Sequence, residues 1–129
     1  MFTTKFFRGL GANTRDRYRD YIFDGAKDVF GKRFKGYSNE YGKRKRANKF
    51  NEQSSKYANS TAPVLTEKFS KDIALKSPNP NGFQLKWAIL GARVGHLAKM
   101  GRVVTSSIQP LPKDTIKAME RDIKVYVDK

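Results

Sequence analysis

The chain has 129 residues, with 27 Lys and Arg against 12 Asp and Glu and a formal net charge of +15. Its length suits one domain with a modest core, and a content of 38% hydrophobic residues is too high for a chain disordered throughout. It has no cysteine, which excludes a disulfide framework and a cysteine-ligated metal site. Such a positive field attracts polyanions, either nucleic acid or an acidic protein surface.

No segment predicts a membrane span. The N-terminal stretch MFTTKFFRGLGANTR lacks a continuous apolar run of signal-peptide length, and no stretch approaches the roughly 18 apolar residues that a spanning helix needs. We therefore expect no membrane partner, and a protein that works inside a cell or in a particle assembled there.

Helical spacing first appears over roughly 13–30. Apolar residues recur there at intervals of three and four, namely Tyr18, Ile22, Ala26 and Val29 or Phe30. Asn13 or Thr14 is suited to cap the N-terminus, and Gly31 to end the helix. Its acidic residues recur at four-residue spacing, at Asp16, Asp20, Asp24 and Asp28. We expect them to form a solvated face paired with Arg and Lys rather than a cation site.

Three phenylalanines precede this predicted helix. Phe2, Phe6 and Phe7 lie in a short, glycine-containing arm outside any clear periodic element. We expect them to contribute to a subunit interface, and packing against the C-terminal helix is the alternative.

Residues 31–63 form a basic segment with nine basic and two acidic side chains and no helical or strand periodicity. A loop of this length is usually functional, or disordered until it binds. The candidate contacts to phosphate or to an acidic neighbour are Lys43, Arg44, Lys45, Arg46 and Lys49. The aromatic residues available for stacking or for an interface are Tyr37, Tyr41, Phe50 and Tyr57. The alternative is a solubilising or protein-docking loop.

The segment after Pro63 predicts a short helix and a β-hairpin. Helical spacing favours a helix at about 65–71, with Thr66 as a cap. The runs DIALKS and FQLKWAILGA flank the turn sequence PNPNG, which is typical of a hairpin. Alternation in the second run places four residues on its buried face, namely Phe83, Leu85, Trp87 and Ile89.

The last part of the chain predicts further helix. ARVGHLAKM can form a short helix, VVTSSI is a strand or an extended arm, and KDTIKAMERDIKVYV is a terminal helix with Asp114 in its first turn. The fold class is therefore α+β, a single domain over 1–129. A small antiparallel sheet with a β-hairpin core packs with N-terminal and C-terminal helices and carries a long basic loop or arm.

Catalysis finds little support in the residues. His96 is the one histidine, set among small and apolar residues in GHLAKM, and we expect it to be structural or partly buried. There is no Walker-type phosphate loop, and neither paired carboxylates nor a metal-ligand pattern stands out. We predict no catalytic residue, no metal and no cofactor, and therefore no enzyme.

Four segments follow one another in a suggestive order. They are FKGYSNEYGKRK from Phe34 to Lys45, then Pro63, Val64, Leu65, Thr66, Phe69 and Ile73, then His96, Leu97 and Gly101, and last Gln109, Pro110, Leu111 and Pro112. Over roughly residues 15–127 this order resembles the tail-completion, or virion-morphogenesis, proteins of tailed bacteriophages. Glu67, Lys71 and Gln109 depart from that family's usual glycine, small residue and arginine.

The resemblance implies a structural virion protein of the neck or tail, a head–tail joining subunit without enzymatic activity. Its partners would be copies of itself in a ring and connector or neck and tail proteins, with the DNA that passes through the channel as a further candidate. It would be assembled in the host cytoplasm. The alternative from composition is a small basic protein that binds nucleic acid without sequence preference.

Overall fold

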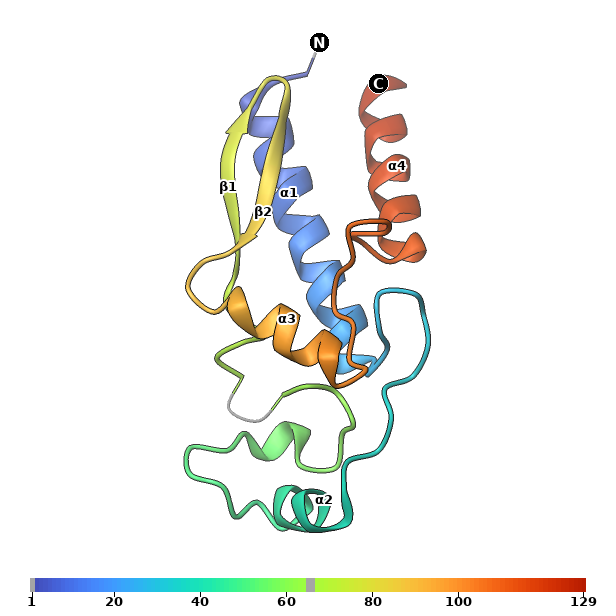
Figure 1. Ribbon diagram of the computed structural model, residues 1–129. Helices are drawn as coiled ribbons and strands as arrows, with labels where there is room; N and C mark the ends of the chain where they lie inside the picture. The colour runs from blue at the N-terminus through green and yellow to red at the C-terminus, as the bar shows by residue number, and fades with distance from the viewer. Residues whose placement is uncertain (1, 65–66) are drawn as a thin grey trace.

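The computed structural model describes residues 2–64 and 67–129, and these form four α-helices and a two-stranded antiparallel sheet. The predicted α+β class is confirmed. The hairpin of β1 (Ile73–Asn79) and β2 (Gly82–Trp87) packs along α1 (Thr4–Arg19), and α4 (Lys113–Val127) contacts α1 as well (Figure 1). The two termini lie at one end of the elongated molecule, and α2 (Asn39–Arg46) lies at the other.

The first helix begins about ten residues earlier than the sequence predicts. Its cap is Thr3, whose hydroxyl accepts the Phe6 N–H at 3.0 Å, so Asn13 and Thr14 are interior residues. Of the two glycines that suggested an arm, Gly11 has a packing role, whereas a Cβ on Gly9 would meet nothing within 4 Å. A Cβ on Gly11 would lie 2.5 Å from Leu75 Cδ1, so glycine there lets the hairpin approach the helix.

The first helix also ends earlier than predicted. After Arg19 it continues as one π-helical stretch, η1 (Asp20–Asp24), and the Gly25 N–H donates to the Asp20 carbonyl at 2.8 Å. A Cβ on Gly25 would meet the Tyr21 carbonyl oxygen at 2.6 Å, which makes glycine the natural end of this turn. The chain then folds back, so that Val29 is buried and its N–H donates to the Val103 carbonyl at 3.0 Å.

The main core surrounds the C-terminal half of the first helix. Its fully or nearly fully buried members are Tyr18, Ile22, Phe23, Val29, Phe34, Tyr57, Ala62, Val64, Phe69, Ile73 and Val104. Trp87 closes one side, because its ring stacks on Phe69 with centroids 4.4 Å apart. Tyr18 donates its hydroxyl to the Val104 carbonyl, which satisfies the one polar atom that this ring brings into the core.

The predicted hairpin is confirmed. Leu75 pairs with Leu85 and Ile73 with Trp87, and in β2 half-buried Phe83, Leu85 and Trp87 alternate with exposed Gln84 and Lys86. The prediction is wrong for Ile89, which follows the end of β2 and is 85% exposed. The Asp72 carboxylate accepts the Ile89 N–H at 3.1 Å and turns the chain away from the sheet.

The later elements match the sequence in part. α3 (Ala92–Lys99) and the terminal helix α4 occur where they are predicted. Residues 67–71 form a turn instead of a helix, and the predicted Leu65 and cap Thr66 lie outside the described residues. VVTSSI is irregular, because the backbone of its first half bonds to separate parts of the core rather than to a neighbouring strand.

Candidate functional site: the basic arm and its pocket

Residues 31–63, here called the basic arm, contain regular structure that the sequence did not predict. α2 lies within it, and Ser55–Tyr57 form a turn of 3-10 helix, η2. The inward positions of α2 are Tyr41, Gly42 and Lys45, so the residue one turn after the aromatic ring is a lysine. Apolar periodicity misses this helix because a charged residue occupies the buried position.

Lys45 is the most buried cation of the arm, with 1% of its surface exposed. Its ammonium donates to the Tyr57 carbonyl at 2.8 Å and to the Ser60 carbonyl, and it lies 5.0 Å from the centre of the Tyr37 ring. Burial, with a smaller contribution from the nearby Arg102 charge, lowers the pKa of Lys45 from 10.5 to about 8. Lys45 therefore ties α2 to the end of the arm.

Three of the four predicted stacking residues of the arm, Tyr37, Tyr41 and Phe50, pack on one another, whereas Tyr57 belongs to the main core. Tyr37 and Tyr41 have ring centroids 4.8 Å apart, and Tyr41 and Phe50 are 5.1 Å apart. The Arg44 guanidinium lies 4.4 Å above the Phe50 ring. These half-buried rings form a small second core that orders the arm from within.

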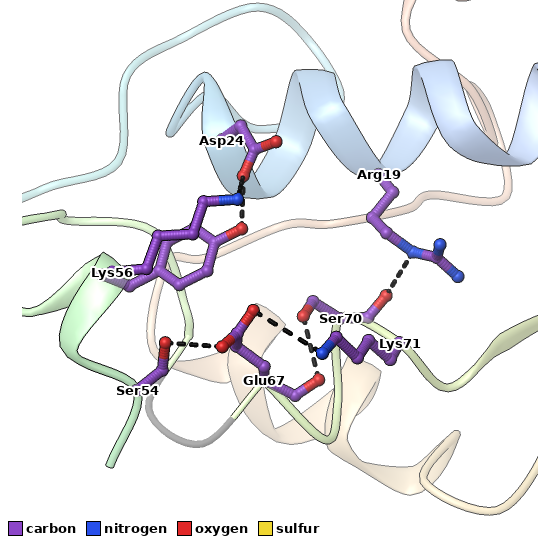
Figure 2. Close-up of polar contacts among 8 residues, drawn as sticks. Arg19, Asp24, Ser54, Lys56, Glu67, Ser70 and Lys71 are labelled. Carbon is purple, nitrogen blue, oxygen red and sulfur yellow. Dashed lines mark hydrogen bonds and ion pairs between the residues drawn. The ribbon is translucent and has the colours of Figure 1, made fainter.

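Polar contacts fasten the arm to the rest of the molecule (Figure 2). Asp24 at the end of η1 accepts the Tyr57 hydroxyl and pairs with Lys56 at 3.5 Å. The hydrogen bond from Tyr57 is the largest influence on Asp24 and lowers its pKa. Ser54 donates to Glu67 at 2.7 Å, which joins the arm to the turn before the hairpin.

The remaining predicted phosphate contacts lie on the outer side of the arm. Lys43, Arg44, Arg46 and Lys49 are exposed, and none of them has a carboxylate within 4 Å among the described residues. The structure thus separates the five basic residues into one inward lysine and four solvent-facing cations. The four are free to meet a polyanion.

A pocket of about 650 Å³ lies between the arm and α3. One wall is formed by α3 and its C-cap residue. Its side chains recur at intervals of three and four residues and so lie on one face, at Arg93, His96, Leu97 and Met100. His96 is exposed on this wall, so the prediction of a partly buried histidine is wrong. Tyr37 and Tyr41 of the arm face it, and Arg102 contributes a buried guanidinium.

Sequence reasoning missed Arg102 and Arg93. Arg102 follows the end of α3, where Gly101 has a φ of 78°. The Gly101 N–H donates to the Ala98 carbonyl and the Arg102 N–H to the Leu97 carbonyl, at 3.0 and 2.8 Å, which is a Schellman ending. The glycine after the helical pattern is the one sequence signal for this turn, and nothing in the pattern predicts that the next residue is buried.

The other predicted interface lies at the opposite end of the molecule. Phe2 and Phe6 stack on Tyr126 of α4, with the Phe6 and Tyr126 centroids 4.1 Å apart, and Phe7 packs beside them. These rings are half-buried and hold the start of α1 against α4. Of the large apolar side chains that remain exposed, Val125 and Val127 flank Tyr126 at this end, and Phe30, Ile89, Met100 and Ile108 lie outside the cluster.

Within residues 2–64 and 67–129, no three or more His, Cys, Asp or Glu side chains are grouped so that they could hold a metal ion. None of the helices in the same ranges is long and apolar enough to cross a membrane. Comparison with protein-family models, with curated proteins and with solved structures found no match.

Proposed function

We propose that the chain is a structural subunit of a tailed-phage virion, at the neck or tail, where copies of it form a ring between connector and tail. The order of its sequence segments supports the virion role. The extended shape and the exposed apolar side chains support assembly.

The observation that carries the proposal is the surface of the molecule. The chain exposes 8275 Å², whereas a compact monomer of its mass exposes about 6,900 Å². The surplus is about 1,400 Å², and Ile89 and Ile108 are each 85% exposed. A subunit whose surface is completed by its neighbours has this combination of excess area and uncovered apolar groups.

A backbone feature adds support to the segment order. Glu67 has a φ of 68°, in the left-handed region that favours glycine. It stands at the position where the resembling family has glycine. The turn before the hairpin thus has the backbone shape that the family's residue would adopt without strain.

The test is the mass of the purified chain in solution, by light scattering across a range of concentrations, at low and moderate salt. We expect a closed multimer of defined mass. The double variant Ile89→Ser/Ile108→Ser should remain monomeric with an unchanged melting temperature, because both side chains are already exposed. Phe6 is a poorer probe, since its truncation also removes packing on Tyr126.

The matched control is Val125→Ser/Val127→Ser, which removes two exposed apolar residues from the far end of α4. It should leave the multimer intact. A multimer unaffected by the Ile89/Ile108 double variant would place the interface elsewhere. Mass spectrometry of purified phage particles tests the virion role separately, and absence of the chain from the particles would reject it.

The second candidate function is nucleic-acid binding without sequence preference. It is favoured by the four exposed cations of the arm, which have no acidic partner among the described residues. A chain that stays monomeric at all concentrations and binds a short DNA duplex tightly at low salt would favour this function over the virion role.

A further inference from the structure

Arg102 is a buried cation that lacks the partner such a group normally has. It is 5% exposed, yet no carboxylate lies within 4 Å of it among the described residues. One terminal nitrogen donates to the Lys35 carbonyl at 2.8 Å, and the guanidinium lies 4.2 Å from the centre of the Tyr37 ring. Its Nε is buried and has no hydrogen-bond partner in the described part of the chain. Burial of a charge is costly unless an opposite charge compensates it.

A second buried cation lies next to the first. Lys45 approaches the same Tyr37 ring, and its ammonium donates to two backbone carbonyls. Two positive charges therefore share one aromatic ring at the base of the arm. Neither has an acidic partner among the residues described, so the local field at this point is positive.

The pocket gives this field access to solvent. Arg102 lines it, and Arg93 and His96 stand on the facing wall of α3, both exposed. Glu67 is the one carboxylate in the described lining, and its oxygens are engaged by Ser54 at 2.7 Å and Lys71 at 3.9 Å (Figure 2). The pocket volume is within the range of small-ligand sites.

We propose that this pocket is a phosphate-binding site, in which the Arg102 guanidinium takes up the phosphate and Arg93 and His96 close around it. A phosphate offers oxygens to the fork of a guanidinium and neutralises the charge that the fold leaves uncompensated. Tyr41 belongs both to the pocket and to α2, so the helix that carries the exposed Lys43, Arg44 and Arg46 borders the pocket. The site does not depend on the virion role.

The same chemistry can come from two sources, a free phosphate or a phosphodiester of a nucleic-acid chain. The test is calorimetric titration of the full chain with inorganic phosphate and, separately, with oligothymidine that lacks terminal phosphates. Trp87 fluorescence is a parallel readout, because Trp87 stacks on Phe69 of the pocket wall. Saturable binding of phosphate identifies the first source, and binding of oligothymidine alone identifies the second.

The variants separate binding from folding. Arg93→Gln/His96→Gln changes two exposed residues and should weaken binding by about tenfold or more with an unchanged melting temperature. Arg102→Lys keeps the charge but removes the fork, and should weaken binding further. The control Arg121→Gln removes an exposed charge from α4 and should change nothing. The proposal is overturned if neither ligand binds saturably, or if binding survives unchanged in the Arg93/His96 double variant.

Discussion

At the scale of single residues, Lys45 is a charged side chain that is buried and packs against the Tyr37 ring. Its ammonium donates to the Ser60 carbonyl, and it adds a second donor to the Tyr57 carbonyl, which also accepts the Ser60 N–H at 3.0 Å. The same burial makes its charged form less favourable in the folded protein than in water. The stability of the arm should therefore depend on pH above about pH 8.

The sign follows from the lowered pKa. Between about pH 8 and the ordinary value of 10.5, the unfolded chain holds a proton on Lys45 that the folded chain releases. The free energy of unfolding should therefore rise from about pH 8 towards 10. Above about pH 10 the trend should reverse, because burial raises the pKa values of Tyr37 and Tyr41 and the unfolded chain loses those protons first.

Urea unfolding followed by circular dichroism at pH 7, 8, 9 and 10 measures this dependence. Lys45→Met should abolish the rise. Lys43→Met is the matched control, because it removes an exposed lysine from the same helix and should retain the rise. An identical profile in all three proteins would show that Lys45 titrates as it would in water.

At the scale of elements, the end of α3 decides where Arg102 lies. Gly101 adopts a φ of 78°, and a Cβ there would meet nothing within 4 Å. The cost of Gly101→Ala is therefore backbone strain alone, and we expect a loss of about 1 kcal/mol in the free energy of unfolding. Thermal or urea unfolding measures it.

Gly95 provides the opposite case within the same helix. It lies inside α3, and its Cβ would also meet open space. Gly95→Ala should raise the free energy of unfolding by about 0.5–1 kcal/mol, because alanine has less conformational entropy to lose on folding. Equal effects of the two alanines would contradict the assigned role of Gly101.

Besides the aromatic packing of Phe6 on Tyr126, the contact between α1 and α4 includes one ion pair. Arg17 donates to both carboxylate oxygens of Asp122, at 2.6 and 3.4 Å, and both side chains are about one-third exposed. A double-mutant cycle with Arg17→Ala and Asp122→Ala should give a coupling of about 0.5–1 kcal/mol. The coupling should shrink in 1 M salt, where the screening length is about 3 Å, and a salt-independent value would contradict an electrostatic origin.

Elements with an apolar period and a clear stop could be predicted from the sequence, and others could not. The terminal helix and the hairpin are predicted because their buried faces are apolar and their ends carry Pro, Asn or Gly. α2 is missed because it buries Lys45, and the first helix is placed too late because Gly11 is needed for close packing rather than for a break. The four exposed cations of the site could be predicted, because residues 31–63 are rich in Lys and Arg. The burial of Arg102 could not, because it depends on a tertiary contact.

At the scale of the whole molecule, the charge is divided unevenly between two ends. The arm carries nine basic and two acidic residues and lies far from the termini (Figure 1). A polyanion that reaches this end meets Lys43, Arg44, Arg46 and Lys49 on the outer side of the arm. Binding there should follow the release of counterions, and so fall steeply as salt rises.

The quadruple variant Lys43→Gln/Arg44→Gln/Arg46→Gln/Lys49→Gln tests this localisation. Lys45 is left in place because it holds the arm together. The slope of log K against log salt for a DNA duplex should fall in magnitude by about three to four, as expected for four lost phosphate contacts. Fluorescence anisotropy at several salt concentrations measures the slope.

The matched control removes the same charge from exposed positions of α4, with glutamine at Lys113, Lys117, Arg121 and Lys124. Both variants have the same net charge, so a general effect of the protein's field lowers the slope equally in the two. Contact at the arm lowers the slope only in the quadruple variant of the arm. Equal losses would show that DNA senses the total charge of the molecule, and the arm would then be a surface for proteins rather than for nucleic acid.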